Sequence, residues 1–493
     1  MATNSFIILR IGGHFVILHP SMERFTLIVL SCLILLASVA CKREPVNFPP
    51  DNTDVVLTAT NLPIVWIDVK GRKIDRYKRV EARVKIIDNG NNQLNYADTV
   101  AHPGQRINYE GYVALRYRGN STYNDSPKKP YSFRTLDGRI KYASKKKVKI
   151  LGMGKDDNWA LLAPYSDKSM MRNLLAFELA RPWMEYTPRG RYCEVFLDGT
   201  YYGVYILCEL VTKGKDRLNL NRPRKTGDAL TGDYLVEVDY DDNVHYLSKY
   251  HPLDSNGNVF TDKFIHFQYK SPDIDDLKSA QLRYINHRID QMEAAFASPD
   301  YDDPVKGYQQ YIDVMSFIDY QLAMELGHNI DAYRKSCKLY KRRDGIDGRF
   351  KTVIWDMNLA YGNCNLHEGW RTDGWVYECN DRLYAAGEDY LIPFWWARLN
   401  SDENYRLMLR ERWAQYRNSN LTEQNVMAVI DSLARQLTVQ NAIDRNSQAW
   451  PRWGVKVWPN YYVSKDFNDE VSHLKQWLRE RIAWMDRALG YSF

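Results

Sequence analysis

The alternation of apolar and polar positions predicts that the first part of the chain is rich in β-strands. Segments 80–87 and 112–117 alternate from one residue to the next, as strands do when one face packs on a core and the other meets water. Asp198-Gly199 separates two apolar runs and predicts a hairpin turn. The strands expected in this way are 64–68, 80–87, 112–117, 129–133, 193–197, 203–209 and 232–239. In the last of these, we assign Glu237 and Asp239 to the protein surface.

Helical spacing of apolar residues dominates from residue 274 onward. Phe317, Tyr320 and Met324 form one such stripe, which Gly327 ends. An earlier helix is expected at 167–181, with Asp167 as its cap. Further helices are expected at 285–296, 391–417, 421–438 and 471–489. Strands followed by helices predict the α+β class.

One hairpin carries a concentration of oxygen-bearing side chains. Strand-like runs at 338–341 and 350–355 flank a glycine-containing connection. Asn329 and Asp331 precede the first run, and Asp356 and Asn358 follow the second, so an antiparallel pairing brings these four residues together. Carboxylate and amide oxygens suit a hard cation such as Mg²⁺, which also keeps phosphate or water ligands. The alternative is that the aspartates only cap turns.

The hairpin resembles the core motif of the spore-coat protein H (CotH) kinase family. That family has an Asn-x-Asp loop, a hairpin with a Tyr-Leu-Tyr-like strand, and a Trp-Asp-x-Asp/Asn segment leading to a glycine. The matching residues here are Asn329-Ile-Asp331, Lys338-Leu-Tyr340, Trp355-Asp-Met-Asn358 and Gly362. Upstream matches, in the same order as in the family, are Arg118-Gly-Asn-Ser-Thr122, Lys128-Lys-Pro-Tyr-Ser-Phe133, Asn158-Trp-Ala-Leu-Leu162, Asp167 with Arg172-Asn173, and Phe196 to Glu209. The resemblance extends over about residues 61–493.

The resemblance implies an atypical protein-kinase-like fold of two lobes that binds ATP with Mg²⁺ or Mn²⁺. We expect a β-rich N-terminal lobe at 59–225 and a mainly helical C-terminal lobe at 226–493, with the catalytic-like hairpin at 328–363. A kinase also pairs a helix glutamate with a strand lysine, a role that Glu178 could fill, but the interpretation that we favour for Glu178 is a solvated side chain.

The resemblance also implies a role for each site residue. Asp331 and Asn329 are the expected catalytic residues, and Asp356 and Asn358 the expected metal ligands. Nucleotide binding is expected from Lys129, Arg118 and Glu209. Lys128 and Arg118 are alternatives to Lys129 as the phosphate cation, and we choose Lys129 because the family has a lysine before the Pro-Tyr strand.

The chain begins with a segment that predicts export. Residues 25–40 are almost entirely apolar and end in small residues before Cys41, as in a bacterial lipoprotein signal. We therefore expect residues 1–41 to be a signal segment, with Met22 as a candidate true start, and Cys41 to carry lipid. Residues 42–58, which contain three prolines, are the expected linker. This predicts a lipoprotein anchored to a membrane of the cell envelope, on its periplasmic or surface face.

Cysteine usage and charge narrow the picture further. Cys364 and Cys379 flank a loop rich in glycine and tryptophan, and we predict a disulfide between them because the protein is expected to be exported. The net charge is +6, and no basic stripe with a binding motif occurs, so we expect no nucleic-acid partner. We expect a monomer.

The predicted function is ATP- and metal-dependent phosphoryl transfer to a hydroxyl of a protein substrate. Asn358 stands where many relatives have a second aspartate, and Ser336 where kinases have a metal-binding asparagine, so a pseudokinase is an alternative. AMP transfer and glutamylation use the same kind of ATP site and form another. A third alternative is a surface lipoprotein that binds glycan or protein through its tryptophan-rich loops, in which Trp370 and Trp375 are the expected groove residues.

Overall fold

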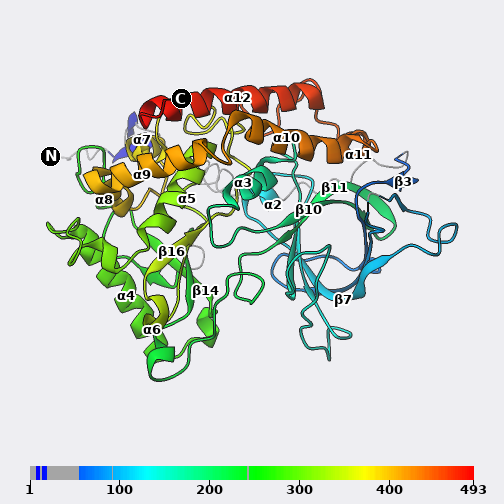
Figure 1. Ribbon diagram of the computed structural model, residues 1–493, viewed down its shortest axis with the longest axis horizontal. Coiled ribbons are helices and arrows are strands. Elements are labelled where there is room, and N and C mark those ends of the chain that lie inside the picture. Colours follow the sequence, from blue (N-terminus) through cyan, green and yellow to red (C-terminus); the bar gives the residue numbers. More distant parts are fainter. Residues whose placement is uncertain (1–6, 12–13, 19–54, 92, 241–243, 493) are drawn as a thin grey trace, which may run out of the picture. The chain divides into compact units, whose positions relative to one another are not determined.

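The computed structural model (Figure 1) describes residues 7–11, 14–18, 55–91, 93–240 and 244–492. The chain divides into two units, residues 1–48 and 49–493. In the first unit, β1 (Ile7–Ile11) and β2 (His14–Leu18) pair as an antiparallel hairpin. Cys41 and the expected signal segment at 25–40 lie outside the described residues. Within the described part of the chain, none of the helices has the length and apolar character needed to cross a membrane.

A closed barrel forms the first part of the second unit. The strand order is β10-β11-β9-β8-β7-β5-β4, and the parallel pairing of β4 with β10 closes the ring. Alternate side chains of the paired strands β5 and β7, such as Val84, Ile86, Val113 and Leu115, are buried in its core, which confirms the alternation seen in the sequence. The barrel strands are β4 (Ile64–Asp68), β5 (Val80–Ile87), β7 (Ile107–Tyr117), β8 (Tyr131–Thr135), β9 (Asn158–Leu162), β10 (Gly190–Leu197) and β11 (Thr200–Glu209). A small separate pair is formed by β3 (Ala59–Thr60) and β6 (Asn95–Tyr96).

A second, antiparallel sheet follows with the order β13-β14-β12-β15-β16. Its last two strands are the predicted hairpin, with Lys338 opposite Val353 and Lys341 opposite Phe350. The connection contains the short helix α6 (Asp344–Asp347). The strands are β12 (Tyr234–Val238), β13 (Tyr246–Leu247), β14 (His266–Ser271), β15 (Cys337–Lys341) and β16 (Phe350–Val353).

Helices make up most of the remainder, as their apolar spacing predicted. The predicted helix at 391–417 is two helices, because Asp402 ends the first and its carboxylate caps the second by accepting from Asn404 N. The predicted helix at 167–181 begins later, at Arg172. The α-helices are α2 (Ser121–Asn124), α3 (Arg172–Ala180), α4 (Ser279–Ala297), α5 (Val314–Gly327), α7 (Asn380–Ala385), α8 (Phe394–Ser401), α9 (Glu403–Arg417), α10 (Glu423–Thr438), α11 (Ala442–Ala449) and α12 (Phe467–Ala488). Short 3-10 helices occur at Asp228–Leu230, Ile274–Asp276, Tyr308–Gln310 and Val376–Glu378.

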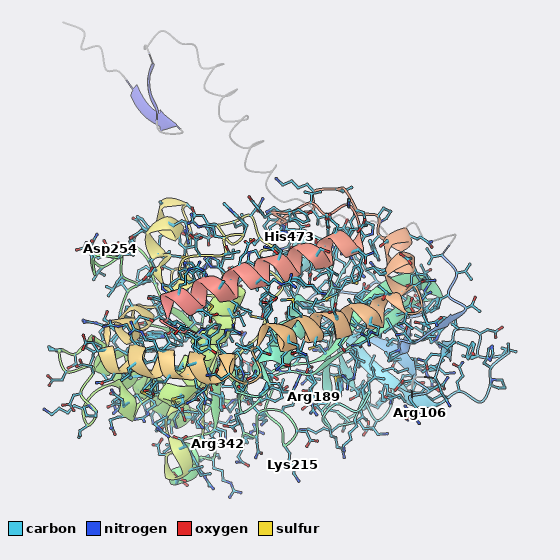
Figure 2. The ribbon with its side chains drawn as sticks, turned by 45° about the horizontal axis from the view of Figure 1, so that its top comes forward. Arg106, Arg189, Lys215, Asp254, Arg342 and His473 are labelled. Atoms are coloured by element: carbon cyan, nitrogen blue, oxygen red, sulfur yellow. The ribbon has the colours of Figure 1, made fainter. Side chains whose placement is uncertain are left out.

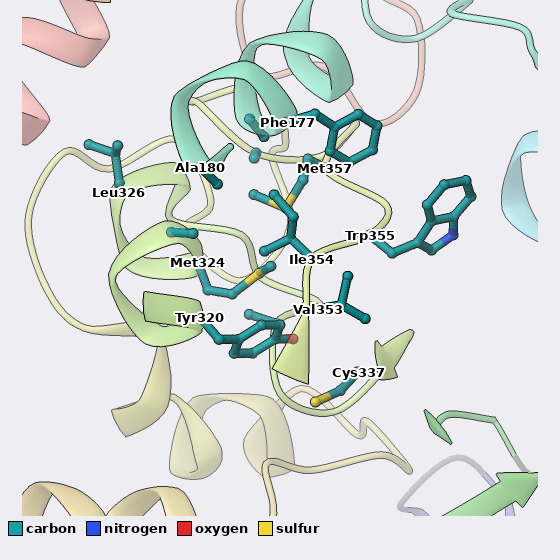
Figure 3. Close-up of a cluster of buried hydrophobic side chains, with 14 of the residues drawn as sticks. Phe177, Ala180, Tyr320, Met324, Leu326, Cys337, Val353, Ile354, Trp355 and Met357 are labelled. Atoms are coloured by element: carbon teal, nitrogen blue, oxygen red, sulfur yellow. The ribbon is translucent and has the colours of Figure 1, made fainter. Parts of the chain in front are cut away.

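The core of the second unit places the hairpin against two helices. α5 is buried on nearly all sides and packs against α3, α9, α12 and β16. Figure 3 shows Tyr320 and Met324 of α5 beside Val353 and Ile354, with Phe177 of α3 close to Met357. Trp395, Trp396 and Trp413 are fully buried, so these tryptophans are core residues, as we expected for most of them. The protein therefore belongs to the α+β class, and the position of its hairpin is set by α3 and α5.

Candidate active site

Three acidic side chains gather at one edge of the five-stranded sheet. β12 and β15 are antiparallel, with Val238 opposite Cys337, and β15 and β16 are antiparallel as well. The end of β12, the start of β15 and the end of β16 therefore share an edge. Asp239 follows β12, Asp331 precedes β15 and Asp356 follows β16. The negative charge of Asp331 is one of the causes that raise the pKa of Asp356, so the two carboxylates lie within electrostatic range of each other.

Asp356 is an accessible carboxylate in a protein-rich environment. Its side chain is exposed, yet desolvation is the largest cause that raises its pKa, ahead of the lowering effect of Arg118. Both observations hold for a carboxylate that is open to solvent on one side and close to many protein atoms on the other. Within the described residues, no side chain or backbone N–H contacts its carboxylate at hydrogen-bond or ion-pair distance. Its φ of 59° lies in the left-handed region, where strain often marks a functional position.

The loop after Asp356 is held by the start of α3. Asn173 Oδ1 accepts a hydrogen bond from Met357 N at 2.8 Å, and Arg172 Nε donates to Ala360 O at 3.1 Å. Arg172 is itself buried between the carboxylates of Asp167 and Glu470, at 2.7 and 2.9 Å. These residues therefore position the Asp356 loop through its backbone and do not contact the Asp356 carboxylate.

Asn329 links the two aspartate loops. It is 2% exposed, and its Nδ2 donates to Asp356 O at 3.5 Å and to Met357 Sδ at 3.4 Å. Its Oδ1 accepts from Asp331 N at 3.3 Å. Because both ends of the amide are used within the protein, Asn329 is a positioning residue.

Asp331 is ion-paired and still partly accessible. Its Oδ1 lies 3.0 Å from Arg334 and 3.6 Å from Lys335, and its side chain is 26% exposed. Arg334 also binds Glu388 at 2.8 Å and donates to Tyr390 O. The Asp331 carboxylate is therefore held in one orientation by cations that are fixed in turn.

Asn358 lies two residues beyond Asp356 with a partly exposed side chain. Its backbone oxygen accepts a hydrogen bond from Asn363 Nδ2 at 2.8 Å, which fixes the local backbone. The amide therefore remains available on the same loop as the Asp356 carboxylate.

Basic and acidic side chains that sequence reasoning did not assign to the site surround this edge. Glu237 is 3% exposed and bridges Lys338 and Lys270, so its assignment to the surface was wrong. Burial opposes ionisation of Glu237, but the charges of the two lysines lower its pKa to about 2. Burial, followed by the charge of Glu237, raises the pKa of Asp239 to about 7. The sequence held a signal for this burial, because the residues of β12 next to Glu237 are all apolar. A run of apolar residues without alternation is typical of a strand that is covered on both faces.

Comparison with protein families places the chain in one of them. The profile of the CotH kinase protein family matches residues 115–485, which include the barrel strands from β8 onward, the second sheet and most of α12. The chain belongs to the CotH kinase family. A search of curated proteins found no match.

The cation that acts on Asp356 most strongly is Arg118, one of the three that the family motifs suggested. Its Cζ lies 5.3 Å from the centre of the Trp355 ring, and burial lowers its pKa, an effect partly offset by Asp356. Lys338 also lowers the pKa of Asp356. In Figure 3 the Trp355 ring points away from Tyr320 and Met324.

The two lysines of the Lys-Lys-Pro-Tyr motif are occupied elsewhere. Lys129 Nζ donates to Tyr123 O at 2.6 Å and lies 5.0 Å from the centre of the Tyr123 ring. Lys128 Nζ donates to Val204 O and to Asn446 Oδ1. Both side chains therefore stabilise local packing of the barrel.

Glu209 and Glu178 also have structural partners. Glu209 is fully buried, and its two oxygens accept from Gly154 N and Arg189 N, at 2.9 and 3.1 Å, and pair with Arg217. Glu178, for which we favoured a solvated side chain over a lysine partner, is 39% exposed and pairs with Arg181 at 2.8 Å. A partner at i,i+3 is close enough to form this pair.

The predicted disulfide between Cys364 and Cys379 is also wrong for this structure. Both cysteines are buried free thiols. Cys364 Sγ accepts from Leu366 N at 3.3 Å, whereas Cys379 Sγ is beside its own neighbours Trp375 and Arg382. The intervening loop is held by other contacts, including the hydrogen bond from Val376 N to Glu325, so it does not need the covalent link.

The acidic groups at this edge fit a nucleotide-bound cation better than a metal held by protein alone. Within the described residues, no three His, Cys, Asp or Glu side chains come together as ligands of one ion. Mg²⁺ characteristically uses one or two protein oxygens together with phosphate and water. One unpartnered carboxylate, Asp356, with an amide at Asn358, matches that requirement.

Proposed function

We propose that this protein is an atypical kinase that transfers the γ-phosphoryl group of ATP to a hydroxyl of a protein substrate. In this proposal the barrel is the N-terminal lobe and the second sheet with its helices is the C-terminal lobe of a kinase-like fold. The observation that carries the proposal is the Asp356 carboxylate, which is accessible, lies on a left-handed backbone and has no partner in the part of the chain that the structure describes. Membership of the CotH kinase family supports the same conclusion.

Asp356 and Asn358 are the proposed ligands for Mg²⁺ or Mn²⁺. When bound, the ion would neutralise charge on the nucleotide phosphates. The contribution of the chain is to keep the Asp356 oxygens free and their loop fixed, which Asn173, Arg172 and Asn329 do through backbone hydrogen bonds.

Asp331 is the proposed residue that orients the acceptor hydroxyl and takes its proton. Arg334 and Lys335 hold the Asp331 carboxylate in place, while about a quarter of its side chain stays accessible. Such a group is positioned before the substrate arrives, which is the main requirement of phosphoryl transfer.

Arg118 is the proposed cation that faces the phosphates. It acts on Asp356 from the end of β7, and Lys338, which is already paired with Glu237, adds a smaller effect from β15. Arg118 is preferred to Lys129 because Arg118 acts on Asp356, whereas Lys129 Nζ donates to Tyr123 O.

Calorimetric titration of ATP into the parent protein and Asp356→Asn tests the proposal. Asparagine tolerates the left-handed backbone and removes only the charge, so metal-dependent ATP binding should be lost without unfolding. Asp389→Asn is the matched control, because Asp389 is an exposed aspartate that pairs with Lys263 elsewhere. If Asp356→Asn binds ATP and Mg²⁺ as tightly as the parent does, the proposed site is wrong.

Mass spectrometry of the parent protein incubated with ATP, Mn²⁺ or Mg²⁺, glutamate and a casein-like acceptor identifies the transferred group. Phosphoryl addition supports the kinase. AMP or glutamyl addition would keep the ATP site and replace the reaction. If the protein binds ATP with metal and transfers nothing to any acceptor, a pseudokinase is the better description.

The proposed location is a membrane of the cell envelope, with lipid on Cys41. The apolar segment at 25–40 before small residues and a cysteine is the basis for this. Cys41→Ala should abolish metabolic lipid labelling and release the protein from the membrane fraction. Unchanged membrane association of that variant would contradict the anchor.

A further inference from the structure

A concave site lies on α12, and its lining residues do not include Asp331, Asp356 or Asn358. It is a depression of about 410 Å³, within the range of small-molecule sites. Figure 2 shows one of its lining residues, His473, on α12. The lining residues come from the 364–379 loop, the segment after Trp458 and α12, and they are Trp370, Arg371, Thr372, Asp373, Tyr461, His473, Gln476, Trp477 and Glu480.

An aromatic platform forms part of this depression. Trp370 and Tyr461 are stacked, with ring centres 4.7 Å apart and planes within 6° of parallel. Tyr461 is 50% exposed, so part of its ring surface remains open to solvent. Trp370 thus lines a groove as we expected, whereas Trp375 packs against Trp484 with ring centres 4.6 Å apart.

Polar groups of both hydrogen-bonding types surround the platform. Arg371 forms two 2.8 Å bonds with Asp373, and Gln476 donates to Glu480 at 2.7 Å. Burial lowers the pKa of His473, so its imidazole is neutral at neutral pH. The depression therefore offers amide, guanidinium and imidazole groups beside the carboxylates of Asp373 and Glu480.

We propose that this depression binds a neutral saccharide. A pyranose ring has an apolar C–H face that packs on an aromatic ring and an edge of hydroxyl groups that both donate and accept. The two carboxylates would repel phosphate or another anion, and the pairing of Arg371 with Asp373 leaves no excess positive charge. The site is thus unsuited to a second nucleotide.

The platform is held in place before any ligand arrives. Trp477 Nε1 donates to Trp370 O at 2.7 Å, and Tyr461 N donates to Asn363 O at 3.0 Å. Trp477 itself is 3% exposed and packs edge-on against Tyr361. Binding therefore needs little ordering of the protein, which favours affinity.

Isothermal titration of the purified full chain with a panel of neutral hexasaccharides, built from glucose, mannose, xylose or N-acetylglucosamine, and with one polyanionic sulfated hexasaccharide tests the inference. At least one should bind, and Tyr461→Ala should weaken it by about tenfold, the upper part of the range for one aromatic stacking contact. Tyr461→Phe keeps the ring and should bind like the parent. Trp458→Ala is the matched control, because Trp458 is 48% exposed on the same segment and does not line the depression.

Three outcomes would overturn the inference. The first is that no neutral saccharide binds at concentrations up to about 10 mM. The second is that Tyr461→Ala leaves the affinity unchanged. The third is that a polyanionic saccharide binds more tightly than every neutral one. Thermal unfolding of each variant separates lost binding from lost folding. None of the substituted residues is among the proposed kinase site residues Asp331, Asp356, Asn358 and Arg118, so the result is independent of the kinase proposal.

Discussion

Glu209 and Asp356 are two carboxylates at the ends of strands, and their surroundings differ completely. Glu209 ends β11 of the barrel, is fully buried, and has both oxygens engaged by two arginines, two backbone N–H groups and the Tyr186 hydroxyl. Asp356 follows β16 of the second sheet, and within the described residues its carboxylate has no such partner. Both were expected at a nucleotide site from their motifs. A family motif alone therefore does not tell whether a carboxylate stabilises the fold or can bind a ligand. That depends on whether its oxygens already have partners within the protein.

Asp331 lies between these extremes and gives the largest expected effect. Asp331→Asn removes the proposed proton acceptor and should lower phosphoryl transfer by about 10²–10⁴-fold. Affinity for ATP with Mg²⁺ should stay close to that of the parent, because Asp331 is not a proposed metal ligand. Labelled-phosphate transfer measures the first quantity and calorimetry the second. Equal loss of binding and transfer would show that Asp331 belongs with the ligands.

Glu209→Ala tests the structural side of the comparison. It leaves Arg217, whose side chain is fully buried, without its carboxylate partner, and should reduce the free energy of unfolding by about 3–5 kcal/mol. Glu178→Ala is the control, because the Glu178–Arg181 pair is about one-third exposed and should contribute about 0–1 kcal/mol. Urea denaturation measures both. A Glu209 variant of parental stability would mean that this network does not hold the barrel end.

Arg118→Met and Lys129→Met sharpen the assignment of the phosphate cation. Methionine keeps the apolar stem of each side chain and removes the charge. Arg118→Met should weaken ATP binding by about 10–100-fold, the value of a charge-assisted hydrogen bond. Lys129→Met should leave it unchanged, because Lys129 Nζ is used by Tyr123 O. The reverse order of affinities would restore Lys129 as the phosphate ligand.

The smallest expected effect is a difference in pH dependence. The pKa of Asp356 is raised by desolvation, so the stability linked to its protonated form is present below its unfolded pKa and is lost as pH rises through the folded value. In Asp356→Asn that loss should disappear, and the variant should gain stability relative to the parent between about pH 4 and pH 7. Urea denaturation without metal or nucleotide at both pH values measures the difference. If the difference in free energy of unfolding between the variant and the parent is the same at both pH values, the Asp356 carboxylate is not desolvated.

Sequence reasoning predicted the elements and the principal pair of aspartates because both depend on short-range patterns. Alternation located β5 and β7, helical spacing located α5 and α12, and hairpin geometry brought Asp331 and Asp356 to one edge. It failed for Glu237 and the Cys364–Cys379 bond, because burial and the choice of partner depend on residues that are distant in the sequence.

The sequence by itself determined the α+β class, the order of strands and helices, and the family motifs, since local backbone preference and apolar periodicity act over a few residues. The tertiary structure alone decided which charged groups are satisfied. Arg172 reaches Glu470 across 298 positions of sequence, and Lys128 reaches Asn446 across 318. These contacts engage some polar groups in stabilising the fold, whereas the oxygens of Asp356 have no partner among the residues that the structure describes. No local pattern encodes that difference, because it depends on desolvation and on charges supplied by the rest of the fold.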